Sequence, residues 1–285
     1  MTGVPALAAA TASDAQARVP FTVDGRGVGS VAREHLALLA SSADWLQVGP
    51  EGVSLPGGLA DRDAALARLH DALRAAGGIL AWRDEIFPLF DPHTLQELAH
   101  IERAATRFWG SLTLGAHATG FVAGGDGRPR HLWIARRSAS KATDPGCFDN
   151  LVGGGVPAGQ SAAEALVREA WEEAGLEPGL AKGARAAGVL RLRRDIPEGL
   201  QHEWLYAYDL ELPAGWVPRN QDGEVAAFTL MPVADALALA CGRVAGPAMT
   251  VDAALVTIDF ALRHALLLDA DLAAAVQRLR VVRSA

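Results

Sequence analysis

The sequence predicts an α/β protein with a mixed sheet between layers of helices, preceded by a smaller α+β domain. We expect the smaller domain over residues 1–112 and the larger one over residues 113–285. Two observations lead to this prediction. Hydrophobic residues make up 50% and charged residues 21% of the 285 residues, as in globular proteins with a large core. After residue 112, short strand-like runs alternate with helical segments, an order typical of an α/β/α layer arrangement.

The first part contains one helix that is defined by both of its ends. Residues 61–76 carry leucines at helical spacing, with Asp61 as a capping residue and Gly77-Gly78 as the end. Residues 1–12 are rich in alanine but contain no basic side chain, and their apolar stretch is short. We therefore interpret them as a loose terminus rather than as a secretory signal.

Two further elements are expected before the larger domain begins. Residues 78–90 predict two short strands joined by a charged turn at Arg83-Asp84-Glu85. Residues 95–109 have helical character. We expect the charged turn to be structural or to contact the other domain, and we assign it no catalytic role.

The larger domain is expected to consist of short strands followed by two closing helices. The predicted strands cover residues 118–123, 132–136, 151–156, 187–192, 203–212 and 225–231. The predicted helices cover residues 233–241 and 251–268. The second of these is the longest apolar segment, but Asp252, Asp259 and Arg263 interrupt it, so it predicts a buried helix rather than a membrane span.

Composition excludes several classes of function. The formal net charge is −7 and no dense run of Lys or Arg appears, which argues against a nucleic-acid partner. Cys147 and Cys241 form no CxxC pair, so neither a zinc site nor a disulfide framework is indicated. Free cysteines fit a reducing compartment, and we expect a cytoplasmic protein without a membrane partner.

The segment that carries chemistry covers residues 153–176, where a glycine-rich loop leads into a helix. Ser161 and Glu164 have the spacing of a capping box, and Gly175 stands where a left-handed residue ends a helix. These signals frame a helix of about 13 residues. Its apolar residues at helical spacing predict the face that packs on the sheet: Ala163, Val167, Ala170, Trp171 and Ala174.

Three glutamates lie on the opposite face of this helix, namely Glu169, Glu172 and Glu173. They occupy its last two turns, where the helix dipole disfavours each carboxylate by about 0.3–1 kcal/mol and like charges repel. A solvated polar face is the simple interpretation, but a nearby cation would offset the cost. Carboxylates with the carbonyls of a glycine loop are ligands that Mg²⁺ prefers, so the segment predicts a metal site.

This segment resembles the Nudix box, G-x5-E-x7-R-E-U-x-E-E-x-G-U, where U is a bulky aliphatic residue. Gly154 opens the match and residues 168–176 close it, with Ala170 as a small form of the aliphatic residue. Gln160 stands where the pattern has its first glutamate. The resemblance implies a Nudix α/β/α sandwich that binds Mg²⁺ or Mn²⁺ and hydrolyses a small diphosphate substrate by attack of water on one phosphorus.

The resemblance also implies roles by position. Glu169 would be a metal ligand and candidate base, Glu172 and Glu173 would be metal ligands, and Arg168 would orient Glu169. Glu169, Arg168 and Glu173 form the expected catalytic set, and the carbonyl of Gly153 is a further expected ligand.

The neutral amide of Gln160 supplies no charge to a metal. It is interpreted either as a tolerated change at a supporting position or as the mark of a non-catalytic module that senses a ligand. We expect Gly154 and Gln160 to contact the substrate.

Candidates outside the box come from four places in the sequence. Arg137 and Lys141 precede the glycine loop and are expected to meet phosphate oxygens, although solvated charges at a strand end are an equal alternative. Glu224 is expected near the metal, with a turn acid as its alternative. Tyr206 shares one strand face with Trp204 and Tyr208, and such an aromatic wall would suit a thiazolium ring. Core packing is the simpler explanation for the three aromatic residues.

Longer stretches resemble one Nudix subgroup, which carries an N-terminal domain of unknown function and is related to the Nudix portion of bifunctional thiamine pyrophosphokinases. They cover residues 19–31, 77–90, 132–159, 200–213 and 220–233. The resemblance implies conversion of thiamine diphosphate or its oxidised analogues to the monophosphate plus phosphate. Another diphosphate such as ADP-ribose is the alternative substrate, and a ligand-binding module is the alternative function. Because dimers are common among Nudix proteins, the resemblance also admits a homodimer.

Overall fold

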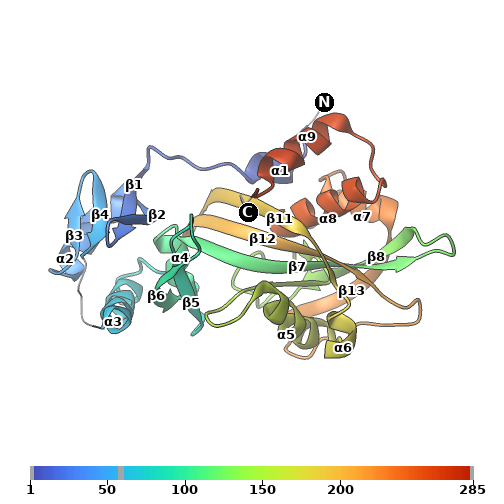
Figure 1. Cartoon of the computed structure of the whole chain (residues 1–285), viewed down its shortest axis with the longest axis horizontal. Coiled ribbons are helices and arrows are strands. Elements are labelled where there is room, and N and C mark those ends of the chain that lie inside the picture. Colours follow the sequence, from blue (N-terminus) through green and yellow to red (C-terminus); the bar gives the residue numbers. More distant parts are fainter. Residues whose placement is uncertain (1–2, 57–60, 283–285) are drawn as a thin grey trace.

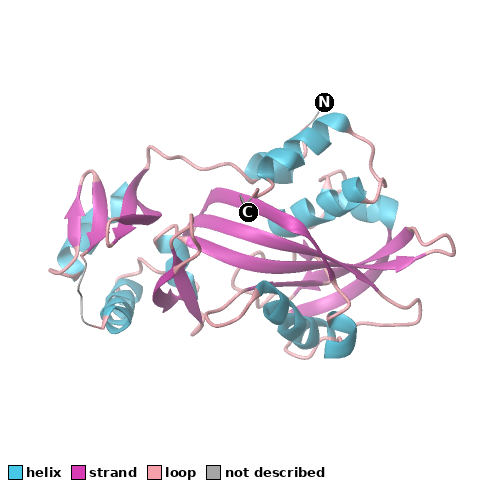
Figure 2. Cartoon of the chain, in the orientation of Figure 1, coloured by secondary structure: helices cyan, strands magenta, loops and turns pink. Residues whose placement is uncertain are grey.

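The computed structural model describes residues 3–56 and 61–282, which form two parts lying side by side (Figure 1). A small sheet, a hairpin and short helices make up the N-terminal part. A long sheet between helices makes up most of the rest (Figure 2). No helix among the described residues is long and apolar enough to cross a membrane.

One hydrophobic core holds the N-terminal part together. Its elements in chain order are β1 (Arg18–Val23), β2 (Arg26–Ala32), the 3₁₀ helix η1 (Arg33–His35), α2 (Leu36–Ser42), β3 (Gln47–Gly49), β4 (Gly52–Leu55), α3 (Arg62–Ala75), β5 (Ile86–Phe90), β6 (Glu97–Glu102) and α4 (Arg103–Phe108). The sheet order is β2-β1-β4-β3, and β5 and β6 form a separate antiparallel pair. In the core, Phe21 of β1 stacks on Trp109, which ends α4, with ring centroids 4.2 Å apart. The beginning and the end of this part therefore close on each other.

The helix predicted over residues 61–76 is confirmed as α3. The Asp61 carboxylate accepts a hydrogen bond from the Ala64 amide, which satisfies one of the free N–H groups at the helix start. The leucines at helical spacing are buried. Gly77 follows the helix with a positive φ of 76°, as expected for a residue that ends a helix.

The two predictions that follow α3 are wrong in part. Residues 78–85 form no strand, and residues 95–109 begin as strand β6 before turning into the short helix α4. In β6, the buried Ala99 and Ile101 are two positions apart, which is the period of a strand. Pairing with β5, which lies outside the segment itself, therefore outweighs its helical character.

The expectation of a loose N-terminus is also wrong. Helix α1 (Pro5–Ala9) packs on a helix of the larger domain, and Ala6 and Ala10 are buried in that domain's core. The carbonyls of Ala10 and Ala12 then accept hydrogen bonds from the amides of Arg193 and Asp195. The alanine-rich composition fits this role, because small side chains allow close packing of helices.

The larger domain is built on a seven-stranded mixed sheet. Its strands are β7 (Leu112–Ala123), β8 (Pro129–Arg137), β9 (Phe148–Asp149), β10 (Val152–Gly155), β11 (Arg185–Ile196), β12 (Gly199–Glu211) and β13 (Val225–Pro232). The main order is β11-β12-β7-β8-β13, with β10 on β7 and β9 on β8. Only β7 and β12 run parallel among these pairs of described strands. Each predicted strand is present, and most are longer than expected.

Helices cover both faces of this sheet, so the predicted α/β/α arrangement is confirmed (Figure 1). One face carries α5 (Ala162–Ala174) and α6 (Pro178–Ala181). The other carries α7 (Val233–Ala240), α8 (Val251–Arg263), α9 (Ala270–Leu279) and α1. Residues 253–261 of α8 are buried without interruption, as predicted for a buried helix rather than a membrane span.

Candidate active site

Helix α5 has the ends that the sequence predicts. The Ser161 hydroxyl accepts a hydrogen bond from the Glu164 amide, and the Glu164 carboxylate accepts one from the Ser161 amide at 2.8 Å. Gly175 ends the helix in the left-handed conformation, with φ 63°. The helix has the expected 13 residues.

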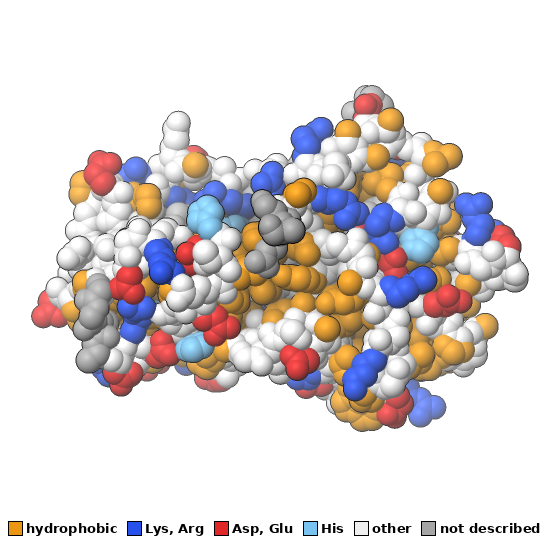
Figure 3. Space-filling model, viewed as in Figure 1, with side chains coloured by type: hydrophobic (Ala, Val, Ile, Leu, Met, Phe, Trp, Pro, Cys, Tyr) orange, Lys and Arg blue, Asp and Glu red, His pale blue; other side chains and the backbone are white. Residues whose placement is uncertain are grey.

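The face on which α5 packs differs from the predicted one. Trp171 is 44% exposed, whereas Glu173 is only 5% exposed. Leu166, Ala170 and Ala174 make the contact with the sheet. Helix α5 is oriented so that Glu173, on its acidic face, lies against strand β10. The other acidic residues of this face border a cleft rather than open solvent. Figure 3 shows that hydrophobic side chains remain visible on the surface of the larger domain in this view.

Three consecutive glycines of β10 allow side chains to approach from both sides of the strand. A Cβ at Gly153 would lie 2.8 Å from the His117 ring, and one at Gly155 would lie 2.7 Å from the Phe87 ring. On the other side, a Cβ at Gly154 would lie 2.2 Å from Cδ of Glu169. Any side chain at Gly154 would therefore displace the Glu169 carboxylate.

Arg168 neutralises two of the three glutamates. Its guanidinium donates to Glu169 at 2.9 Å and to Glu172 at 2.7 Å, and a third contact reaches the Gln160 amide oxygen at 3.3 Å. Burial raises the pKa of the Glu169 carboxyl, and the positive charges of Arg168 and Arg103 act in the opposite direction. The sequence predicts that Glu169 and Glu172 share one face of the helix, and in the structure Arg168 forms ion pairs with both of them.

Lys141 lies between two other carboxylates. Its ammonium contacts Glu224 and stands 3.6 Å from Glu173. Glu173 also accepts a hydrogen bond from the Gly153 amide at 3.0 Å. Burial, together with the negative charge of Glu169, raises the pKa of Glu173 to about 8, and burial lowers the pKa of Lys141. Glu224, which lies far along the sequence, is thus brought to the same cluster.

These residues border one cleft of about 100 Å³. The predicted residues that line it are Arg137, Lys141, Gly153, Gly154, Arg168, Glu169, Glu172 and Glu224. Glu173 lies behind them in contact with Lys141, and Gln160 reaches the cleft only through Arg168. Arg137 is held by Asp149 at 2.8 Å and by the carbonyl of Thr143 at 2.9 Å.

Tyr206 does not line this cleft. With Trp204 and Tyr208 it packs on the sheet face covered by α5, within the same hydrophobic cluster as Leu166 and Ala170. The simpler explanation for these aromatic residues, core packing, matches this position. We therefore give Tyr206 no part in the function proposed below.

The cleft also contains residues to which the sequence analysis gave no role. Asp222 and Thr143 come from loops of the larger domain, and Arg83, Glu85 and Arg103 come from the N-terminal part. The charged turn at residues 83–85 was the only signal for the N-terminal residues. Nothing in the local sequence of this turn indicates that it lies close to the glycine strand β10.

The oxygen donors fit a hard divalent cation, but they are not yet gathered around one point. Over residues 3–56 and 61–282, no three His, Cys, Asp or Glu side chains are already arranged to hold a metal ion. Arg168 and Lys141 instead occupy the carboxylates. Burial, followed by the negative charge of Glu169, raises the pKa of Glu173, so its charged form is disfavoured where it stands. A divalent ion beside it would stabilise that charged form.

Comparison with known families agrees with this geometry. Residues 113–249 match the NUDIX domain model, and residues 4–112 match a domain of unknown function, DUF4743. The chain contains a Nudix domain. The match begins where β7 begins and includes the glycine strand and α5.

Two curated plant relatives share this Nudix domain. Nudix hydrolase 20, chloroplastic, of Arabidopsis thaliana is 38% identical over 204 residues, which cover 72% of this chain and 53% of that protein. Nudix hydrolase 24, chloroplastic, of the same plant is 39% identical over 208 residues, with 73% and 55% covered. The chain spans about half the length of these curated relatives. The solved structure of DR0079 from Deinococcus radiodurans has 26% identity and a TM-score of 0.46, and the match covers 60% of this chain and 97% of that one.

Restoring the Nudix-box glutamate with Gln160→Glu is expected to change kcat by less than about 10-fold. The amide of Gln160 contacts Arg168 from the side away from the glutamates, and a carboxylate there would make the same contact. Loss of a residue that positions a metal ligand typically lowers metal affinity or activity by about 10–100-fold. A change in kcat below that range would therefore identify Gln160 as a supporting position. Steady-state rates with Mg²⁺ test this, and a gain of about 100-fold would show instead that the native site is weakened.

Without metal, stability is expected to fall as the pH rises from about 5 to about 8. The pKa of Glu173 is raised from 4.5 to about 8 in the folded protein, so folding favours its protonated form. The contribution of protonated Glu173 to the free energy of unfolding is fully present below pH 4.5 and is lost as the pH rises through about 8. Melting temperatures in EDTA across this range should decline less for Glu173→Gln than for the native protein. Equal slopes would contradict the assignment.

Proposed function

We propose that this protein is a divalent-metal-dependent Nudix hydrolase that cleaves the diphosphate of a small molecule, with thiamine diphosphate or its oxidised analogues as the preferred substrate. The observation that carries the proposal is the meeting of Glu169, Glu172 and Arg168 with Lys141 and Arg137 in one cleft. The names of the plant relatives support the reaction class, and the resemblance to the Nudix portion of thiamine pyrophosphokinases supports the substrate.

The carboxylates of α5 would hold the ion, with the Gly153 carbonyl and Glu224 as further ligands. When bound, Mg²⁺ or Mn²⁺ supplies charge neutralisation at the diphosphate and lowers the pKa of water. Arg168 positions Glu169, whose pKa is raised by burial towards the range suited to a general base. In the reaction, water oxygen bonds to one phosphorus, the bridging P–O bond breaks, and Glu169 takes the proton of the water.

A feature of the inner cleft supports an organic cation as the rest of the substrate. Beyond Gly153 and Gly154 the space continues to a second pocket. Its charged lining consists of four acids and three arginines, namely Asp144, Asp149, Glu203, Asp252, Arg103, Arg107 and Arg137. Burial, followed by the charge of Asp252, raises the pKa of Glu203. One buried oxygen of Asp252 has no hydrogen-bond partner among the described residues. A positively charged thiazolium ring beside Glu203 and Asp252 would stabilise their charged forms, whereas ADP-ribose offers no such cation.

The test is product release from thiamine diphosphate, its oxidised analogues, ADP-ribose and NADH, with Mg²⁺, Mn²⁺ or EDTA. Selective turnover of the thiamine compounds that stops in EDTA is expected. Turnover of a nucleotide instead would retain the reaction and discard the substrate. Binding without any turnover would favour the non-catalytic module. A cytoplasmic location and a homodimer stay predictions.

Glu203→Gln is expected to raise the KM for thiamine diphosphate by about 10-fold, which corresponds to about 1.4 kcal/mol of binding free energy. Turnover of a diphosphate with an uncharged base should stay unchanged, because such a base makes no ion pair with Glu203. Glu211→Gln is the matched control, because Glu211 lies exposed at the far end of the same strand. Equal KM values in the two variants would remove the support that the inner acids give to a cationic substrate.

A further inference from the structure

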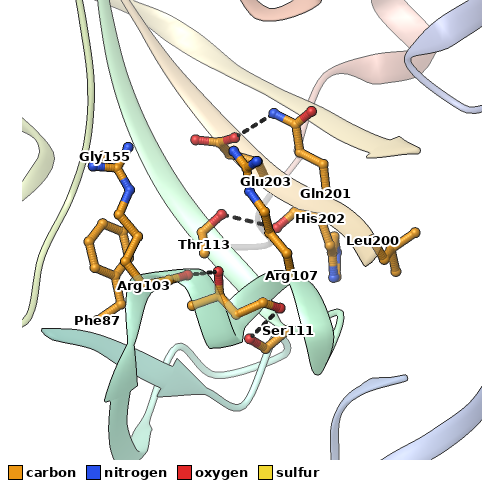
Figure 4. A pocket seen from close by; sticks show the side chains of 11 residues that line it. Phe87, Arg103, Arg107, Ser111, Thr113, Gly155, Leu200, Gln201, His202 and Glu203 are labelled. Carbon is orange, nitrogen blue, oxygen red and sulfur yellow. Dashed lines mark hydrogen bonds between the residues drawn. The ribbon is translucent and has the colours of Figure 1, made fainter. Parts of the chain in front are cut away.

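The N-terminal part contributes two arginines, Arg83 and Arg103, to the Nudix cleft. Arg103 begins α4, and its guanidinium lies 5.3 Å from the centre of the Phe87 ring and donates to Glu85 at 2.9 Å. A Cβ at Gly155 of the glycine strand would lie 3.5 Å from Cζ of Arg103. Figure 4 shows Arg103 beside Phe87 in a neighbouring pocket that Gly155 also lines. Arg103 is therefore in reach of the strand that borders the Nudix glutamates.

One buried carboxylate positions both arginines. Glu102 is 5% exposed and accepts hydrogen bonds from the backbone amides of Arg83, at 2.8 Å, and of Ala104, at 3.2 Å. The first bond fixes the turn that carries Arg83, and the second caps the helix that begins with Arg103. The backbone of the hairpin is joined to the Nudix loop as well, because the Ala158 amide donates to the Ile86 carbonyl at 3.0 Å.

The three cations that the Nudix domain contributes to the cleft are already paired, in contrast to Arg83. Arg168 is held by two glutamates, Lys141 by Glu224 and Glu173, and Arg137 by Asp149. Among the ion pairs of residues 3–56 and 61–282, none involves Arg83.

Burial and the nearby positive charges of Arg103 and Arg107 lower the pKa of Arg83. An anion between Arg83 and Arg103 would remove this repulsion.

We propose that Arg83 and Arg103 bind phosphate oxygens of the diphosphate, so that the N-terminal domain completes the substrate site of the Nudix domain. The inference rests on the proposed function. A guanidinium presents a planar set of N–H donors that matches phosphate oxygens, which makes arginine suited to this task. Glu85 is 47% exposed in its side chain, so its pairing with Arg103 is readily exchanged for a phosphate.

The test compares Arg83→Gln and Arg103→Gln with Arg68→Gln, a control on the exposed face of α3 in the same domain. Binding of inorganic pyrophosphate is measured by calorimetry in EDTA, where no metal contributes and no turnover occurs. We expect about 10-fold weaker binding for each cleft variant and unchanged binding for the control. Arg83→Lys should recover part of the loss, because it restores the charge but not the planar donors.

Turnover of the diphosphate substrate provides the second measurement. The KM of each cleft variant should rise by about 10-fold or more, with a smaller change in kcat. If the native protein turns over a diphosphate and the cleft variants match Arg68→Gln in both measurements, the inference fails and the proposed function stands. If no diphosphate is turned over but both cleft variants bind pyrophosphate more weakly while Arg68→Gln does not, the inference stands and the proposed function fails. Absence of pyrophosphate binding by the native protein overturns the inference.

Discussion

Glu173→Gln is expected to reduce metal-dependent hydrolysis by at least about 100-fold, the upper end of the effect of losing an outer-shell partner of a metal site. Glu173 is the most buried of the four glutamates of α5, and the amide of glutamine brings no charge to an ion. The variant should remain folded, because Lys141 keeps its contact with Glu224 and the glutamine oxygen can still accept the hydrogen bond from the Gly153 amide. Initial rates at several Mg²⁺ concentrations would measure the loss.

The matched control is Glu177→Gln, since Glu177 is exposed just beyond α5 and its side chain makes no capping hydrogen bond. Its rate should equal that of the native protein. Full turnover by Glu173→Gln would show that the metal is held elsewhere. A melting temperature well below that of the native protein in EDTA at pH 8 would contradict the idea that the charged form of Glu173 is disfavoured by its burial.

Gly154→Ala is expected to lower kcat by about 100-fold or more with little loss of stability. The new methyl group would lie 2.2 Å from Cδ of Glu169, and the carboxylate, at the end of a flexible side chain, would have to move. Displacement of a catalytic group by about 1 Å is enough to cost about 100-fold in rate. The effect should therefore appear in turnover and not in the melting temperature.

Gly179→Ala provides the comparison for this change. Nothing lies within 4 Å of the position that a Cβ at Gly179 would take, so this alanine should alter neither the rate nor the stability. If Gly154→Ala retained native turnover, Glu169 would not need its observed position, and its assignment as the general base would be withdrawn.

The sequence predicted α5 almost completely because the signals that define it are local. The capping box, the helix length and the final glycine all lie within 15 consecutive residues, from Ser161 to Gly175. The layer arrangement followed from the order of strands and helices. Strand lengths were underestimated, because pairing with β7 and β12 extends runs that are not strongly apolar themselves.

The remainder depends on contacts between distant segments. Helical periodicity predicted that Trp171 is buried, whereas in the structure Trp171 is exposed and Glu173 is buried beside β10. Lys141 contacts Glu224, which is 83 positions away, and Arg83 lines the Nudix cleft beside a hairpin whose second strand looked helical. Contacts between residues so far apart in the sequence leave no local pattern. The sequence therefore identified the glutamates of the site and only some of its cations.

The path of the chain at its beginning has a consequence for how the protein is assembled. Helix α1 belongs to the core of the Nudix domain, and the chain then leaves that core, builds the N-terminal part, and returns at β7. The N-terminal part is thus tied to the larger domain at both of its ends, through α1 and through β7. During synthesis, α1 emerges first but must wait for α8, over 200 residues later, before its buried alanines have a partner. Removing residues 1–112 would also uncover the edge of β11, an unpaired strand edge of the kind that promotes aggregation.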